Sequence, residues 1–173
     1  MTKTELLRTI EILFWEQSFS DLSMDAIARK LGMKKPSLYY HFPSKEAMFF
    51  AVVETSFETY QSFLVSTLHD EDILDMLSKL ILFPYRERNL FAVASQKGYC
   101  QIEEIHRFIS EKSEEIRTMI SGICTERFSW SPIRTFVFLA TIDALAKRCS
   151  IEQCENKNLQ EVVVEIQALF FNQ

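Results

Sequence analysis

The sequence is poor in the residues that interrupt helices. Its 173 residues include three glycines and four prolines, and each lies where a helical pattern of apolar residues breaks. No stretch shows the sustained alternation of apolar and polar residues, rich in β-branched side chains, that is typical of strands. Internal repeats and low-complexity segments are also missing. The sequence therefore predicts an all-α fold.

Long apolar runs are missing as well. Charges at Lys3, Glu5 and Arg8 exclude a signal peptide at the N-terminus. The longest apolar stretches, such as residues 136–142, are too short to span a bilayer. We therefore expect a cytoplasmic protein that does not contact the membrane. Disulfides are rare in that compartment, so the four cysteines are expected to be small apolar core residues.

The patterns of catalytic and metal sites do not occur. The three histidines are scattered, and there is no HExxH, no GxSxG and no glycine-rich phosphate loop. Cys149 and Cys154 are five residues apart, too far for a CxxC pair. We expect no enzyme activity, no metal and no cofactor. Sensing through a cysteine thiol stays open as a minor alternative.

The charge of the chain is unevenly distributed. The formal net charge is −5, yet residues 26–45 contain no acid. A basic strip on an acidic protein indicates one anionic partner that binds at one place. The five bases of this strip are Arg29, Lys30, Lys34, Lys35 and Lys45.

The same region has the pattern of a helix-turn-helix motif. Ser23 is a suitable N-cap for a short helix, and Asp25 lies in its first turn. Gly32 supplies the residue that tolerates positive φ at a helix end, and Pro36 suits the first turn of the next helix. The second helix is rich in groups that reach phosphates and base edges. We therefore expect this segment to bind nucleic acid.

Residues 6–53 resemble the DNA-binding domain of the tetracycline-repressor (TetR) family of bacterial regulators. The resemblance rests on Ile10, Leu13 and Phe14 of the first helix and on the segments SMDAIARKLG and PSLYYHFPSKEAMFFAV. It covers about the first third of the chain. It implies a homodimeric transcription regulator that binds double-stranded DNA at a near-palindromic operator. We expect a DNA-binding domain over residues 1–48 and an effector-binding and dimerisation domain over residues 49–173.

The family motif also implies which residues contact DNA. By position, Lys35 and Pro36 are expected to face base edges, and Tyr40 to join them or to contact the backbone. Lys34 stands where many relatives have a small capping hydroxyl. The other members of the set are expected mainly to hold phosphates. The whole set is Ser23, Lys34, Lys35, Pro36, Ser37, Tyr39, Tyr40, His41 and Lys45.

The breaks in the helical pattern predict nine helices. They cover about residues 2–17, 24–31, 35–42, 45–67, 71–83, 86–97, 101–123, 132–149 and 158–171.

The middle of the chain is the expected effector site. The resemblance implies a pocket there, and fifteen phenylalanines in the chain would favour an apolar or aromatic small molecule. An ordinary aromatic core, with polar groups bonded to backbone, is the alternative. The candidate ligand contacts are Phe57, Tyr60, Phe63, Phe83, Phe91, His106 and Ser113.

The last two helices are the expected dimer interface. Each is apolar on several faces, which indicates burial on more than one side, and in the resembled family they form a four-helix bundle with their mates. The alternative is burial of both helices within one subunit. The candidate interface residues are Phe136, Ala140, Ala144, Val162, Val163, Ile166 and Phe170.

These expectations combine into a dimeric, ligand-responsive transcription regulator. We expect a repressor that a small apolar or aromatic effector releases from its operator. One alternative is a DNA-binding regulator without a small-molecule effector, controlled by a partner protein or by cysteine oxidation. A small-molecule enzyme on this fold is the third.

Overall fold

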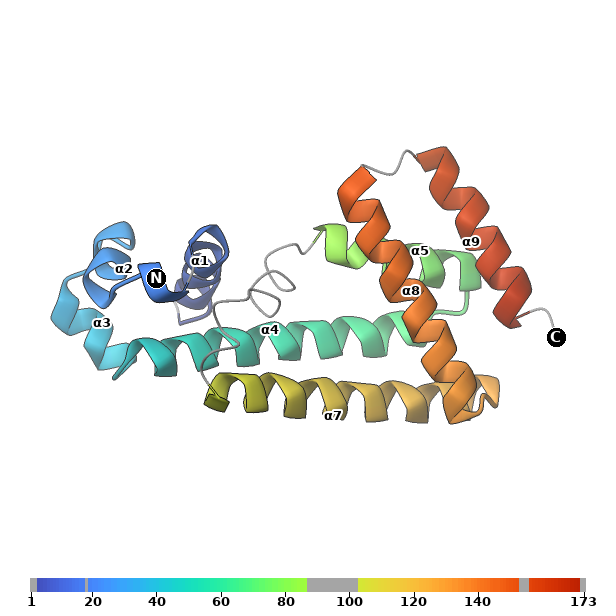
Figure 1. Ribbon diagram of the computed structural model, residues 1–173, viewed down its shortest axis with the longest axis horizontal. Coiled ribbons are helices and arrows are strands. Elements are labelled where there is room, and N and C mark those ends of the chain that lie inside the picture. The colour runs from blue at the N-terminus through green and yellow to red at the C-terminus, as the bar shows by residue number, and fades with distance from the viewer. Residues whose placement is uncertain (1–2, 18, 87–102, 153–155, 172–173) are drawn as a thin grey trace. The chain divides into compact units, whose positions relative to one another are not determined.

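The computed structural model of the chain describes residues 3–17, 19–86, 103–152 and 156–171. Within these residues all regular structure is helical, as Figure 1 shows, and the expected all-α class is confirmed. The expected helix over residues 86–97 lies outside them apart from its first residue. The elements are α1 (Lys3–Glu16), a 3₁₀ helix η1 (Phe19–Asp21), α2 (Met24–Lys30), α3 (Lys35–His41), α4 (Lys45–Leu68), α5 (Ile73–Arg86), α7 (Glu103–Phe128), α8 (Pro132–Glu152) and α9 (Asn156–Phe171).

The chain divides into two compact units. Among the described residues, the first unit comprises residues 3–59 and 103–112, and the second comprises residues 60–86 and 113–171. Helices α4 and α7 therefore each contribute to both units. The division expected at residue 48 is a different one: it separates a DNA-binding domain from an effector-binding and dimerisation domain. It stays a prediction.

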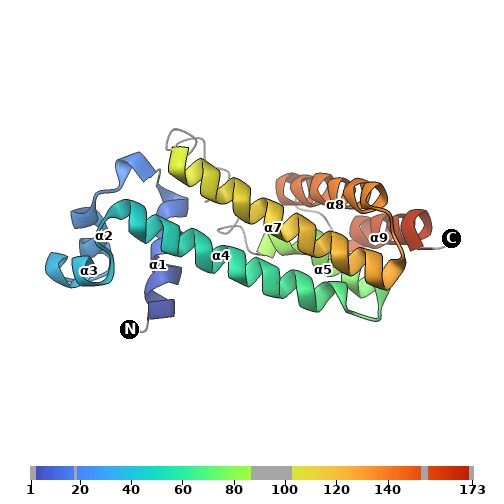
Figure 2. The same ribbon diagram turned by 90° about the horizontal axis from the view of Figure 1, so that it is seen from below.

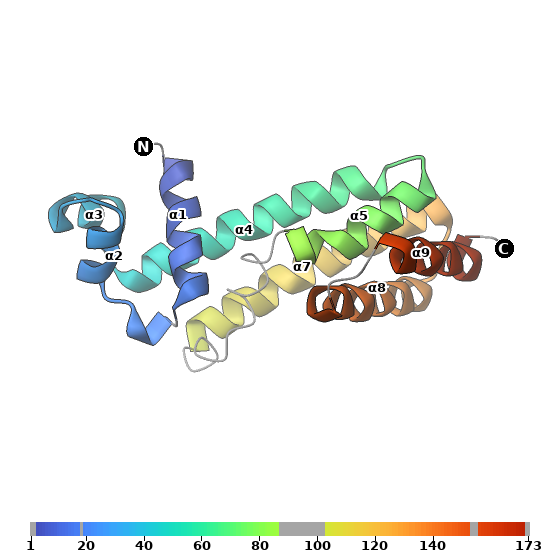
Figure 3. The same cartoon turned by 90° about the horizontal axis from the view of Figure 1, so that it is seen from above.

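The first unit is built around three phenylalanines. Phe14 of α1, Phe19 of η1 and Phe49 of α4 are buried, and the ring of Phe49 meets the other two edge-on with centroids 5.2 and 5.4 Å away. Such aromatic pairs add specific geometry to the apolar area that they bury. Figure 3 shows α1 crossing the first turns of α4, with α2 and α3 beside it. Ile105, from the start of α7, completes this core.

The turn between α2 and α3 forms as the sequence predicts. Gly32 has a φ of +64°, the left-handed conformation that glycine adopts without strain. The amides of Gly32 and Met33 donate to the carbonyls of Arg29 (3.2 Å) and Ala28 (2.9 Å), which satisfies the end of α2. At the other end of α2 the Ser23 hydroxyl accepts from the amide of Ala26 at 3.1 Å, as expected for an N-cap.

The second unit places α5 against both α8 and α9, and Figure 2 shows these last two helices side by side. An aromatic cluster joins them: the ring of Phe138 in α8 lies 5.1 Å from Trp130 and 5.3 Å from Phe170 of α9. Arg134 Nη2 also donates to the carbonyl of Phe170 at 2.6 Å. The inner sides of α8 and α9 therefore pack against residues of the same chain.

The expected end of the seventh helix near residue 123 is wrong. Helix α7 passes through Gly122 and continues to Phe128. It ends where Ser129 adopts a φ of +55° and the Trp130 amide donates to the carbonyl of Cys124 at 3.4 Å. A glycine inside a helix costs about 1 kcal/mol. Burial of Cys124 and Trp130 beyond it outweighs that cost.

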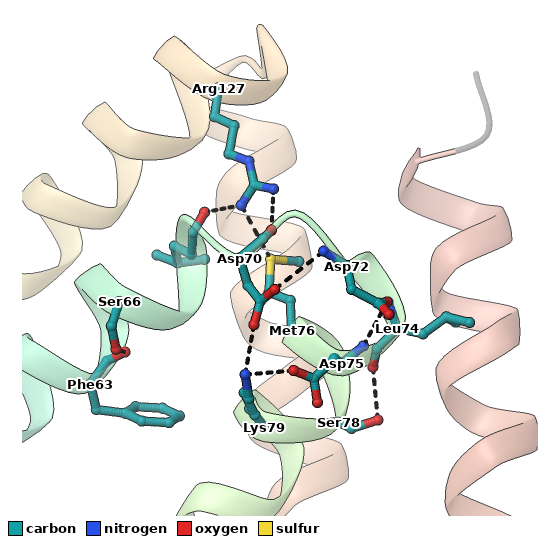
Figure 4. Close-up of polar contacts among 11 residues, drawn as sticks. Phe63, Ser66, Asp70, Asp72, Leu74, Asp75, Met76, Ser78, Lys79 and Arg127 are labelled. Carbon is teal, nitrogen blue, oxygen red and sulfur yellow. Dashed lines mark hydrogen bonds and ion pairs between the residues drawn. The ribbon is translucent and has the colours of Figure 1, made fainter.

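An arginine ties α7 to the turn between α4 and α5, as Figure 4 shows. The Arg127 guanidinium donates to the carbonyl of Leu68, the last residue of α4, and to the carbonyl of Asp70 in the turn that follows. Carbonyls at a helix end have no partner within the helix, so they need donors from elsewhere. On the far side of the turn, Lys79 Nζ bonds to Asp70 (2.6 Å) and Asp75 (2.5 Å). The hydrogen bond from Lys79 holds the pKa of Asp70 below its usual range.

We predict that Arg127→Met lowers the free energy of unfolding by about 1–3 kcal/mol, because it leaves the Leu68 and Asp70 carbonyls without their donor. Arg117→Met is the matched control. The exposed ion pair of Arg117 with Glu114 should contribute less than about 1 kcal/mol. Urea unfolding followed by circular dichroism measures both variants. Equal losses in the two would contradict the role of Arg127.

Candidate DNA-binding surface

Helix α3 presents one side to the core and the rest to solvent. Leu38 and Phe42 are buried, and they fix the rotation of the helix. Lys34 is the N-cap, but its side chain makes no capping hydrogen bond, and Pro36 lies in the first turn. Position 34 has no capping hydroxyl. The first turn of α3 is held by the backbone instead, since the Lys34 carbonyl accepts from the amide of Ser37 at 2.9 Å.

The outward side of α3 carries hydroxyl and aromatic groups. Tyr40 is the most protruding of them, with 87% of its surface exposed, and its ring stands edge-on to His41 at 5.5 Å. Tyr39 is 42% exposed, and Ser37 is exposed beside it. Tyrosine and serine hydroxyls donate to and accept from phosphates and base edges. The structure therefore brings the expected α3 contacts together on one accessible face.

One basic group of this face is paired with an acid. Lys35 Nζ lies 2.8 Å from Oδ1 and 3.0 Å from Oδ2 of Asp25, in the first turn of α2. This hydrogen bond and the charge of Asp25 raise the pKa of Lys35 above its ordinary value. The sequence predicts only that Asp25 favours the start of a helix. The pairing shows that it also belongs to the surface, and no signal at a spacing of ten residues indicates it.

Lys45 has a second role that the sequence did not indicate. Its Nζ donates to the carbonyls of Phe19 (2.7 Å) and Leu22 (2.9 Å) and lies 4.1 Å from the centroid of the Phe19 ring. Two of its three donor protons are thus committed to the backbone that leads into α2. The expected contact of Lys45 with a phosphate stays a prediction, and only the third ammonium proton is left to donate to that phosphate.

Of the expected effector contacts that the structure describes, some belong to the first unit and others to the second. Tyr60, Phe63 and Phe83 stack in the second unit, with the Phe83 centroid 5.5 Å from Tyr60 and 3.8 Å from Phe63. Phe57 packs on the core of the first unit, and the side chain of His106 is exposed there. Ser113 is partly buried in the second unit, and Phe91 lies outside the described residues.

A groove of about 600 Å³ lies between α7 and α8 of the second unit. None of the expected effector contacts lines it, whereas Phe136 from the expected dimer interface does. Its lining residues are Glu114, Arg117, Thr118, Ser121, Gly122, Thr125, Glu126, Pro132, Thr135, Phe136 and Leu139.

The expected dimer residues fall on two sides of their helices. Phe136, Ala140 and Ala144 of α8 are exposed. Val163 and Ile166 of α9 are buried inside the unit. The remaining two, Val162 and Phe170, are partly buried, and Phe170 belongs to the internal aromatic cluster.

In the described part of the chain, no helix combines the length and apolarity needed to cross a membrane. The same residues bring together no group of three histidine, cysteine, aspartate or glutamate side chains that could hold a metal ion.

Helices α2 and α3, with the glycine turn between them, form a helix-turn-helix motif of the kind found in DNA-binding domains. Residues 6–52 match the family model described as bacterial regulatory proteins, tetR family. This match assigns residues 6–52 to the DNA-binding domain of that family.

One curated relative and two solved structures are similar to the chain. The chain is 27% identical over 125 residues to the biofilm operon icaADBC HTH-type negative transcriptional regulator IcaR of Staphylococcus epidermidis. That match covers 68% of this chain and 64% of IcaR, so it spans less than two thirds of that relative.

The two structures show the fold. A transcriptional regulator (TerR/AcrR family) from Aquifex aeolicus matches with a TM-score of 0.80 and 21% identity, over 99% of this chain and 100% of that one. FadR from Bacillus subtilis, in complex with stearoyl-CoA, matches with a TM-score of 0.71 and 14% identity, over 98% and 97%.

We predict that Lys45→Met lowers the free energy of unfolding by about 1–3 kcal/mol, because the Phe19 and Leu22 carbonyls lose a charged donor. Lys34→Met is the matched control, because Lys34 is exposed and makes no capping bond, and its effect should stay within about 0.5 kcal/mol. Denaturant unfolding measures both. If Lys45→Met weakened DNA binding without lowering stability, Lys45 would be a phosphate contact alone.

Proposed function

We propose that the chain is a homodimeric repressor that binds a near-palindromic DNA operator through α3 and is released by a small apolar or aromatic effector. The observation that carries the DNA-binding part is the exposed α3 face with Lys35, Tyr39 and Tyr40, set in a basic strip of an acidic chain. A helix of this kind enters the major groove, and a two-fold dimer places two copies on successive half-sites. The domain division at residue 48 is part of this proposal.

The outward side of α8 supports the dimer. Ile133, Phe136 and Val137 are 75, 66 and 50% exposed, and the small residues Ala140 and Ala144 continue the same side. Contiguous exposed apolar side chains of this kind mark association surfaces. On α9, Val164 and Leu169 are exposed, at 53 and 64%. The proposed interface therefore consists of these outward residues, while Val163 and Ile166 support it from within.

The stacked rings of Tyr60, Phe63 and Phe83 support an apolar or aromatic effector. Burial, together with the charge of Asp143, raises the pKa of Tyr60 to about 12, so its hydroxyl is protonated near neutral pH, as that of an ordinary tyrosine is. FadR, which shares the fold, holds an acyl-CoA. We do not assign His106 to this site, because its side chain is exposed in the first unit.

Release by the effector follows from a shift between conformations. A ligand changes DNA affinity only as far as it binds the two conformations unequally. Helix α4 is continuous from Lys45, which holds the backbone before α2, to Leu68, whose carbonyl accepts from Arg127. Tyr60 and Phe63 lie on that same helix, so an effector that separates the rings would act on α4 directly.

Thiol oxidation is disfavoured at Cys124. This residue is fully buried, and burial raises the pKa of its thiol to about 11, although Thr135 and Arg127 act in the opposite direction. Because the thiolate is the reactive form, Cys124 is inert in the folded protein near neutral pH. The side chains of Cys100, Cys149 and Cys154 lie outside the described part of the chain.

We predict that Ala140→Glu abolishes dimerisation and operator binding, because it buries one uncompensated carboxylate per subunit, at a cost of several kcal/mol. Gln61→Glu adds the same charge at an exposed position of α4 and is the control. Sedimentation gives the oligomeric state, and circular dichroism checks the fold. A dimeric Ala140→Glu variant that binds DNA normally would contradict the interface.

We predict that effectors entering the ring stack raise the melting temperature as their concentration increases, because they bind the folded state. Anilinonaphthalene sulfonate and stearoyl-CoA serve as probes. Phe63→Leu should weaken binding of the active probe about three- to tenfold, because a ring stack contributes roughly 0.5–1.5 kcal/mol. His106→Ala is the control and should leave it unchanged. The bound probe should also weaken binding of a selected DNA duplex, with a coupling of about 1–3 kcal/mol.

Failure of both probes to raise the melting temperature would count against this class of effector. An unchanged affinity in Phe63→Leu would place the bound probe elsewhere in the chain.

A further inference from the structure

The Asp25–Lys35 pair is the feature of the DNA-binding surface that the proposed function leaves unexplained. Asp25 is the sole acid between residues 22 and 45, and it lies among five bases. An acid there opposes binding to phosphates, because affinity for the DNA backbone comes from neutralising its charge. An exposed ion pair contributes little to stability. The place of Asp25 in the first turn of α2 favours an acid there but does not explain its pairing with Lys35. An acid that weakens general DNA binding is a means of selecting one sequence over others.

The two side chains remain accessible while they contact each other. The Lys35 and Asp25 side chains are 53 and 56% exposed. Lys35 Nζ contacts both oxygens of Asp25, at 2.8 and 3.0 Å. Two contacts leave at least one of the three ammonium protons and about two of the four acceptor sites of the carboxylate unused. The Lys35 ammonium and the Asp25 carboxylate can therefore each hydrogen-bond to a base while they stay paired. Each charge then keeps an opposite charge beside it when water is excluded.

The spacing of the pair matches the exposed edge of one base pair. In the major groove guanine presents the acceptors O6 and N7, and its partner cytosine presents the donor N4–H₂. Guanine O6 and cytosine N4 are hydrogen-bonded to each other and so lie about 2.9 Å apart. Lys35 Nζ and Asp25 Oδ1 are 2.8 Å apart, with the opposite donor and acceptor character.

We propose that Asp25 and Lys35 act together as one recognition unit that selects a G·C base pair in each half-site. Lys35 Nζ donates to guanine O6 and N7, and the Asp25 carboxylate accepts from cytosine N4. An A·T pair fits less well, because no base in it offers two adjacent acceptors to the lysine. This inference rests on the proposed binding of DNA by α3, and it adds Asp25 as a residue that determines specificity.

The test uses the full chain and a pool of random double-stranded DNA. Wild type is used to select duplexes from the pool, and the preferred G·C pair in each half-site is then replaced by A·T. Affinities for both duplexes are measured with wild type, Asp25→Ala, Lys35→Ala and the double variant. Glu16→Ala is the matched control, because Glu16 forms a looser ion pair with Lys30 (3.8 Å) in the same unit.

Wild type should prefer the G·C duplex by about tenfold or more. Asp25→Ala and Lys35→Ala should each reduce this preference to about twofold, and the double variant should reduce it no further, because the two groups act as a unit. Glu16→Ala should raise the affinity for both duplexes by one common factor. Asp25→Asn, which keeps an acceptor oxygen, should retain an intermediate preference. Melting temperatures confirm that each variant is folded.

Two results would overturn the inference while leaving the proposed function intact. In one, Asp25→Ala strengthens binding to both duplexes equally, as the Glu16 control does. In the other, Lys35→Ala loses the preference and Asp25→Ala keeps it. A wild-type protein that selects no duplex from the pool would instead overturn the proposed DNA binding itself.

Discussion

The position of α3 depends on the contact between Lys45 and the backbone before α2. Its ammonium joins the first residue of α4 to the carbonyls of Phe19 and Leu22, more than twenty residues earlier in the chain. The same ammonium lies over the Phe19 ring, which packs on Phe14 and Phe49. The polar contact and the aromatic core therefore fix one segment from two sides. Helices α2 and α3, seven residues each, have little stability of their own and take their arrangement from this frame.

The parts of this arrangement that are encoded locally could be predicted from the sequence. The Ser23 cap and the positive φ of Gly32 act over three or four residues, and the expected limits of α2 and α3 are right to within one residue. A local signal also predicts that the start of α3 lacks a side-chain cap, since Lys34 has no capping hydroxyl and makes no capping bond. Where the stop signal is not a glycine, the prediction fails. Helix α7 ends at Phe128, and the residue after it, Ser129, adopts a positive φ that is uncommon for any residue other than glycine and that the sequence does not indicate.

Contacts between distant residues could not be predicted in the same way. The donors of Lys45 and Arg127 reach carbonyls 23 to 59 residues away, and a carbonyl has no sequence signature. The pairing of Lys35 with Asp25 depends on how α2 packs against α3, which periodicity does not specify. The predicted effector contacts are mainly aromatic. Aromatic character cannot separate Phe57, on the core of the first unit, from Phe63 and Phe83, which stack in the second unit.

Helix α8 shows the same limit and what resolves it. Its sequence is apolar on several faces, so the pattern alone leaves open which face is internal. The structure assigns the inner face through Phe138, which meets Trp130 and Phe170. Phe136, two residues earlier on the helix, must then point away from that cluster, and it is 66% exposed. One side of α8 already packs inside the chain, so the exposed apolar residues on its other side add no packing within the chain. We explain these residues by association with another molecule.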